Sequence, residues 1–151
     1  MPQSLARVLI HTIFSTKRRA PCLRDVDLRS QLYPFMGGVS DKLGCNPIRI
    51  GGTADHVHLL TTLSRTVTIA EFVKEVKRVS TDWIQDHGHD LASFRWQAGY
   101  GAFSVSESNK DAVVEYILHQ EEHHRTVTFQ DEFRGFCDKH GIDYDERYVW
   151  D

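Results

Sequence analysis

The chain has 151 residues, of which 40% are hydrophobic and 26% are charged, a balance that suits a single domain and excludes a disordered or collagen-like chain. The formal net charge of -3 argues at first against a nucleic-acid binder, because such proteins usually carry an excess of Lys and Arg. The charge is unevenly distributed, however, since residues 1–80 hold 12 Lys and Arg against 6 Asp and Glu, whereas residues 81–151 hold 6 against 15. This asymmetry keeps nucleic acid among the expected partners.

The cysteines and the apolar segments indicate in which cellular compartment the protein is expected. Cys22, Cys45 and Cys137 are never spaced C-x-x-C, which predicts neither a disulfide framework nor a cysteine zinc site. The basic cluster near the amino end follows an apolar stretch, whereas a secretory signal has its basic residues first. No run approaches the roughly 18 apolar residues of a membrane span. We therefore expect a cytoplasmic protein with no membrane partner.

The first half of the chain alternates strand and helix patterns. Residues 6–14 are rich in β-branched residues and predict a strand that leads into the basic turn at residues 17–19. Apolar residues then recur at helical spacing over residues 28–43 and stop at Gly44, although Pro34 lies inside the pattern. Residues 47–51 and 56–62 predict a hairpin across the turn-forming residues between them.

The next element is a helix with clear sequence signals at its start. Thr68 and Glu71 form a T-x-x-E capping box, and the apolar face continues to Ile84. Residues 99–106 predict a strand, residues 108 to about 124 a helix capped by Ser108, and residues 129–139 a final amphipathic helix. This order predicts an α+β fold with a mostly antiparallel sheet and helices packed on it, in a single domain of residues 1–151. Residues 126–151 are expected to form its carboxyl-terminal helix and acidic tail.

Two histidines in the second predicted hairpin strand suggest a metal site. His56 and His58 flank Val57, and the two-residue period of a strand places both imidazoles on one face. Two neutral imidazoles in this arrangement can share one divalent ion. The spacing alone has little specificity, since nine histidines in 151 residues give about 0.5 such pairs by chance. Two histidines on a half-exposed strand remain the alternative.

The helix predicted after residue 108 offers further groups. Tyr116 and Gln120 are four residues apart and therefore share a helix face, where a phenol could act as nucleophile and an amide oxygen could complete a metal site. Core packing is the alternative for the tyrosine, because its neighbours are apolar. Five nearby residues could also be ligands or could simply form a solvated helix end. They are His119, Glu121, Glu122, His123 and His124.

In combination, these motifs resemble the single-tyrosine HUH transposases of small insertion sequences and their relatives that act on repetitive extragenic palindromes. The resemblance covers nearly the whole chain and includes ADHVHLL at 54–60, FRWQAGYGAFSVSESN at 94–109, YILHQEEHHR at 116–125 and the ending YDERYVWD. One departure is His119, which stands where the family commonly has Asn. His119 could therefore assist or replace Gln120.

The resemblance implies a ferredoxin-like HUH domain that cleaves and rejoins single-stranded DNA at hairpin-containing element ends through a covalent 5′-phosphotyrosine. It implies that Tyr116 is the nucleophile and that His56, His58 and Gln120 hold Mg²⁺ or Mn²⁺. It also implies a homodimer and no nucleotide cofactor, and the chain indeed lacks a G-x-x-x-x-G-K-[ST] loop.

Basic residues of the first half are the candidate contacts to the DNA backbone, and Trp96 or Tyr100 could stack on unpaired bases. An ordinary solvated charge is the alternative for each cation, and their clustering is what favours the set. The candidates are Lys17, Arg18, Arg19, Arg65, Lys74, Lys77 and Arg78.

Parts of the sequence also fit two other functions. Gly99-Tyr100-Gly101 resembles the start of an RNP1 signature and suggests a non-catalytic nucleic-acid binding module, but Ala98 and Ala102 break the signature. A two-histidine RNA phosphoesterase needs paired H-x-T/S motifs. His124 begins one at residues 124–126, but His58 begins none.

Overall fold

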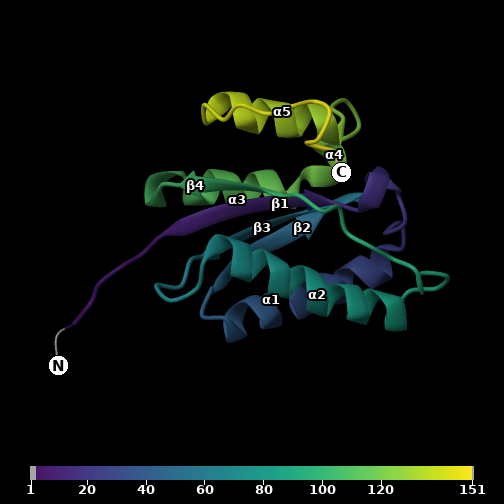
Figure 1. Ribbon diagram of the computed structural model, residues 1–151, viewed down its shortest axis with the longest axis horizontal. Coiled ribbons are helices and arrows are strands. Elements are labelled where there is room, and N and C mark those ends of the chain that lie inside the picture. Colours follow the sequence, from purple (N-terminus) through teal and green to yellow (C-terminus); the bar gives the residue numbers. More distant parts are fainter. Residues whose placement is uncertain (1–2, 151) are drawn as a thin grey trace.

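The computed structural model describes residues 3–150 and has a β-α-β-β-α-β core followed by three further helices (Figure 1). The core elements are β1 (Leu9–Ser15), α1 (Val26–Lys42), β2 (Pro47–Gly52), β3 (His56–Thr62), α2 (Ile69–His87) and β4 (Gly101–Val105). The helices α3 (Lys110–Leu118), α4 (Gln120–His123) and α5 (Phe129–Lys139) follow. Short 3-10 turns occupy Lys17–Arg19 and Glu107–Asn109.

The four strands form one antiparallel sheet in the order β2-β3-β1-β4. This order, with a helix between β1 and β2 and another between β3 and β4, is the ferredoxin-like arrangement. The α+β fold with a mostly antiparallel sheet is therefore confirmed.

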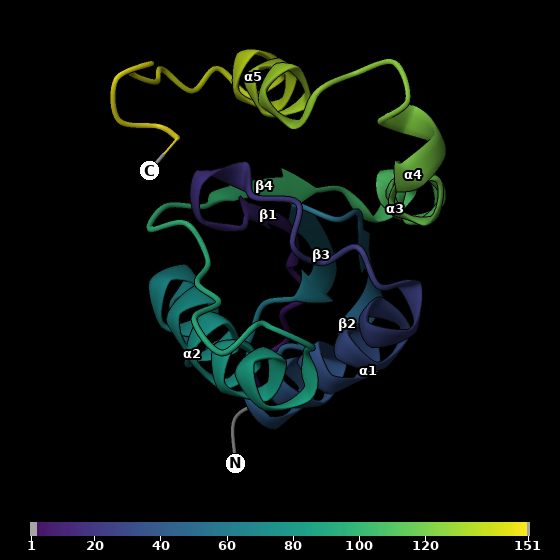
Figure 2. The same cartoon turned by 90° about the vertical axis from the view of Figure 1, so that its right-hand side faces the viewer.

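Helices cover both faces of the sheet. Figures 1 and 2 show α1 and α2 against one face and α3, α4 and α5 on the other side. As a result every residue of β1, and all but the last of β3, is buried. The two-residue period sends Phe14 and Val57 into the core with α1 and α2, and Ile13 into a second cluster with Phe103 and Phe133 beneath α5. His56 and His58 alternate with Val57 and therefore face the α3–α5 side.

The ends of α1 and α2 have local causes. The Asp25 carboxylate accepts hydrogen bonds from the backbone N–H groups of Asp27 and Leu28 and so caps α1, which continues unbroken past Pro34. The predicted capping box of α2 is present, since Thr68 and Glu71 each accept from the other's backbone N–H.

The expectation of one helix from Ser108 to about His124 was wrong. α3 ends at Leu118 and α4 begins at Gln120, because His119 has φ -103 and ψ 27, outside the helical region. Ser108 does not cap α3 either, since its hydroxyl pairs with that of Ser106 and the N-cap position belongs to Asn109. Tyr116 and Gln120 thus lie on two helices that meet at a bend.

Within residues 3–150, none of the helices has the length and apolar character needed to span a bilayer.

The contact between β2 and α3 positions the tyrosine helix and gives a first prediction. A Cβ added at Gly51 would lie 3.0 Å from Cγ2 and 3.1 Å from the carbonyl oxygen of Ile117 on α3. Gly51→Ala should therefore push α3 outward and lower the free energy of unfolding by about 1–3 kcal/mol, measured by urea denaturation. Gly38→Ala on α1 is the matched control, since no atom lies within 4 Å of the added Cβ, and it should raise stability by about 0.5–1 kcal/mol. Equal effects of the two substitutions would contradict this packing.

Candidate metal and tyrosine centre

His56 is held from behind by a carboxylate. Its side chain is fully buried, and its Nδ1 lies 2.7 Å from Oδ1 of Asp55 and 3.0 Å from Oγ1 of Thr53. A carboxylate only accepts hydrogen bonds, so Nδ1–H donates to Asp55 and the Nε2 of a neutral ring keeps its lone pair. Metal-binding histidines characteristically have such a partner on the second nitrogen.

His58 is held by another histidine. Its Nδ1 lies 2.8 Å from Nε2 of His11 on the neighbouring strand β1, and both side chains are buried. Burial lowers the pKa of His58 to about 4, although the nearby Glu132 carboxylate opposes this shift. Burial likewise lowers the pKa of His11 well below its usual value. Both rings are therefore neutral near pH 7.

The structure brings Tyr116 and Gln120 to this histidine pair within one chain. Oε1 of Gln120 lies 3.0 Å from Nε2 of His56, and the ring centroids of Tyr116 and His58 are 5.8 Å apart. His119 takes no part, because its half-exposed ring turns back toward the Glu115 carbonyl. The amide after the bend in the helix therefore faces the histidines, and His119 does not replace it.

Glu132 on α5 joins the cluster. Its side chain is 1% exposed, its Oε1 lies 3.0 Å from Nε2 of His58, and its Oε2 lies 3.1 Å from Nε2 of His124. Burial raises the pKa of this carboxyl, but its contacts with His124 and His58 outweigh burial and hold the pKa well below its usual range. Glu132 is consequently a carboxylate at any physiological pH.

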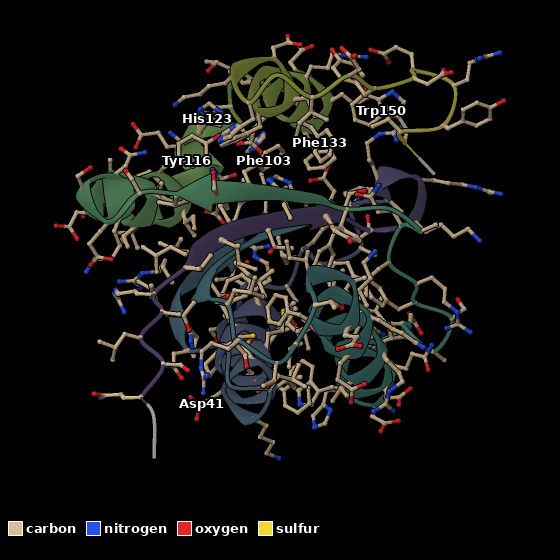
Figure 3. The ribbon with its side chains drawn as sticks, turned by 60° about the vertical axis from the view of Figure 1, so that its left-hand side comes forward. Asp41, Phe103, Tyr116, His123, Phe133 and Trp150 are labelled. Atoms are coloured by element: carbon tan, nitrogen blue, oxygen red, sulfur yellow. The ribbon has the colours of Figure 1, made fainter. Side chains whose placement is uncertain are left out.

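The Tyr116 hydroxyl is directed at the same carboxylate. It donates a hydrogen bond to Oε2 of Glu132 and lies 3.2 Å from Nε2 of His123. Burial and the negative charge of Glu132 raise the pKa of Tyr116, so the hydroxyl is a neutral phenol in this state. Figure 3 shows Tyr116 and His123 on the side of the sheet that α5 covers, with Phe103 and Phe133 nearby.

The arrangement of lone pairs fits a divalent cation. Nε2 of His56 faces Oε1 of Gln120 at 3.0 Å and Oε1 of Glu132 at 3.5 Å, and all of these atoms accept hydrogen bonds. Bonds of about 2.1 Å to a shared ion place neighbouring ligand atoms about 3.0–3.4 Å apart, for angles between 90° and tetrahedral. Ligand atoms of His56, His58, His124 and Glu132 all lie within 4.8 Å of one another. The donor set therefore suits a metal ion.

Sequence reasoning missed Glu132 and His11 and preferred a solvated helix end for His124. A signal for Glu132 was present, because it lies between Phe129 and Phe133 on the apolar face of the predicted helix 129–139, where a charged residue is unexpected. No spacing rule linked this position to residues 56–58.

The predicted DNA-contacting residues occupy three regions. Lys17, Arg18 and Arg19 form the turn after β1, Arg65 lies in the loop after β3, and Lys74, Lys77 and Arg78 lie on α2. All of these residues except Arg19 and Lys77 are exposed.

Lys77 has a structural role. Its ammonium donates to the carbonyls of Gln97, Ala98 and Gly99 at 2.8, 3.3 and 2.7 Å, which fixes the segment before β4. Burial lowers the pKa of Lys77 to about 8. With all three protons used, Lys77 has none to offer a phosphate unless this segment rearranges.

A groove of about 440 Å³ lies between α2 and residues 95–100. Lys74, Arg78, Arg95 and the partly exposed Tyr100 line it, so cations and one aromatic ring meet there. Trp96 is 7% exposed and donates from Nε1 to Ser80 Oγ, which makes it a core residue and leaves Tyr100 as the ring available for stacking.

Comparison with known proteins gives one family and two similar folds. The family model described as "Transposase IS200 like" matches residues 4–120. The crystal structure of a candidate transposase from Deinococcus radiodurans R1 has a TM-score of 0.62 and 23% identity, covering 80% of this chain and 95% of that one. A REP-associated tyrosine transposase bound to a REP hairpin has a TM-score of 0.57 and 18% identity, covering 90% and 88%. Among curated proteins no significant match was found.

The Asp55–His56 contact gives a second prediction. Asp55→Asn should lower Mn²⁺ affinity by about 10–100-fold, measured by isothermal titration calorimetry, because the carboxylate fixes the ring and raises the basicity of its free nitrogen. Asp41→Asn is the matched control, since Asp41 is exposed at the carboxyl end of α1, on the opposite side of the sheet (Figure 3). Equal affinities for the two variants would show that Asp55 does not support a metal ligand.

Proposed function

This chain belongs to the IS200-like transposase family, and we propose that it cleaves and rejoins single-stranded DNA at hairpin-containing ends through a covalent 5′-phosphotyrosine on Tyr116. The observation that carries the proposal is the position of the Tyr116 hydroxyl beside the His56–His58 pair and Gln120 in the same chain. The hydroxyl finds its hydrogen-bond acceptor there, and the same position places its oxygen beside the candidate metal ligands.

The metal site proposed for this reaction contains His56, His58 and Gln120. A bound Mg²⁺ or Mn²⁺ would act as a Lewis acid on a non-bridging phosphate oxygen and oppose the charge that develops in the transition state. His56 and His58 contribute fixed neutral rings, oriented by Asp55 and His11. This orientation is set before DNA binds, so no reorganisation of the rings is required.

Tyr116 provides the nucleophile. Its oxygen attacks the phosphorus, the bond from phosphorus to the 3′ oxygen breaks, and the departing strand takes a proton and ends in a 3′ hydroxyl. The phenolic proton must leave at the same time, and the acceptors in contact with it are Glu132 and His123. Attack by a 3′ hydroxyl on the tyrosyl phosphate reverses these steps, rejoins DNA and returns the proton to Tyr116. No nucleotide cofactor is needed, because the phosphodiester bond is exchanged and not hydrolysed.

Substrate binding is proposed for the exposed basic residues around the turn after β1 and along α2, with Arg65 beyond them. The solved neighbour bound to a REP hairpin supports a hairpin as the kind of DNA involved. A homodimer and a cytoplasmic location are parts of the same proposal. The single chain already brings its own tyrosine to its own histidines, so cleavage requires no tyrosine from a second subunit.

The nucleophile is tested with hairpin-containing single-stranded DNA and Mn²⁺. Wild-type protein should form an adduct that survives denaturing electrophoresis, and Tyr116→Phe should form none while it still binds DNA, because only the oxygen is lost. Tyr148→Phe is the matched control, since this tail tyrosine is 67% exposed, and it should form the adduct normally. An adduct with Tyr116→Phe would refute the assignment, and wild-type binding without any adduct would favour a non-catalytic binding module.

The basic surface is tested by the dependence of DNA affinity on salt. Lys74→Ala/Arg78→Ala should weaken binding and make the slope of log affinity against log salt shallower by about 1.5, since each lost phosphate contact removes about 0.7–0.9. Lys42→Ala/Lys139→Ala removes the same charge from exposed ends of α1 and α5 and should leave the slope unchanged. A slope that is the same in both double variants would remove α2 from the DNA-binding surface.

A further inference from the structure

The residues that follow the family match contribute side chains to the centre. The match ends at residue 120, yet His124 and Glu132 both lie within the group of ligand atoms around His56 and His58. We propose that the carboxyl-terminal segment completes the metal site, with His124 and Glu132 as additional ligands, and that the site therefore selects a first-row transition-metal dication over Mg²⁺. This inference rests on the proposed metal site and extends it.

His124 has the features of a ligand. Its Nδ1 lies 2.7 Å from the carbonyl oxygen of Val127, which can only accept a hydrogen bond, so Nδ1–H donates there. Nε2 then faces Oε1 of Gln120 at 3.0 Å and Oε2 of Glu132 at 3.1 Å. Burial lowers the pKa of His124, but the contact with the Glu132 carboxylate outweighs burial and raises it, so Nε2 can carry a proton when no metal is bound. The two oxygens are acceptors, so either a proton or a metal ion must lie between them and Nε2, and a bound metal would replace the proton. A backbone carbonyl on the second ring nitrogen is also a usual partner of metal-binding histidine.

Glu132 is fixed in place by packing. Its neighbours Phe129 and Phe133 are buried in the cluster with Ile13 and Phe103 that attaches α5 to the sheet. The carboxylate is almost completely buried, and no Lys or Arg nitrogen within residues 3–150 lies within ion-pair distance of it. A buried carboxylate is costly unless a positive group compensates its charge, and a dication among these ligands would do so.

The composition of the enlarged set determines the choice of ion. Three imidazole nitrogens from His56, His58 and His124 join one carboxylate and one amide oxygen. Mg²⁺ prefers oxygen ligands in near-octahedral geometry and retains several waters, whereas imidazole suits Zn²⁺, Fe²⁺, Ni²⁺ and Cu²⁺, and Mn²⁺ is the weakest binder among the first-row dications at such sites. With only His56, His58 and Gln120 the nitrogen preference would be weaker.

The experiment measures metal binding by the full chain without DNA, using MnCl₂, ZnCl₂ and MgCl₂ in isothermal titration calorimetry. Wild-type protein should bind Mn²⁺ and Zn²⁺ at least tenfold more tightly than Mg²⁺. Glu132→Gln and His124→Ala should each lower Mn²⁺ affinity at least tenfold. Asp138→Asn, an exposed position on the same helix, is the matched control and should bind like wild type. Wild-type Mn²⁺ affinity in Glu132→Gln and His124→Ala would overturn the proposal.

A second readout needs no variant. Pulsed electron paramagnetic resonance of Mn²⁺ bound to wild-type protein should detect three coordinated imidazole nitrogens, and a count of two would exclude His124. The outcome is separable from the proposed function. If both variants keep their metal affinity while the wild-type protein forms the DNA adduct, the additional ligands are refuted and the proposed function stands. If metal affinity depends on Glu132 but the wild-type protein forms no DNA adduct, the proposed DNA cleavage is refuted and the additional ligands stand.

Discussion

The rest of the centre is arranged around the buried carboxylate of Glu132, which faces four imidazole rings and a phenol. A carboxylate that is almost fully buried without a Lys or Arg partner within residues 3–150 is costly, and the ring nitrogens of His58 and His124 are the nearest groups directed at it. A protonated imidazole or a bound metal ion would offset this charge, and the Tyr116 hydroxyl donates a hydrogen bond to the same carboxylate. The proposed metal ligands and the proposed nucleophile therefore belong to one cluster of side chains.

The fold places these groups by simple geometry. The two-residue period of β3 turns His56 and His58 to the same face, while Val57 and Leu59 anchor the strand in the core beneath α1 and α2. The bend at His119 then separates the directions of Tyr116 and Gln120, so that the hydroxyl lies near His58 and Glu132 and the amide reaches His56. The aromatic cluster beneath α5 delivers Glu132 to the remaining side.

Much of this could be predicted from the sequence, because it depends on local patterns. Strand alternation located the histidine pair, the capping box located α2, and helical spacing located the helix at residues 129–139. The contribution of Glu132 could not be predicted, since it depends on how α5 docks on the sheet through contacts distant in sequence. The role of Lys77 was hidden for the same reason, because its carbonyl partners lie about twenty residues away. Tertiary contacts decided both cases.

The most direct test of the account is a crystal structure of the wild-type chain with bound Mn²⁺, with the ion located by its anomalous scattering. We predict one strong anomalous peak bounded by Nε2 of His56 and of His58, with the Tyr116 hydroxyl of the same chain facing it. A peak elsewhere on the molecule, or none at this position at saturating Mn²⁺, would contradict the existence of a metal and tyrosine centre.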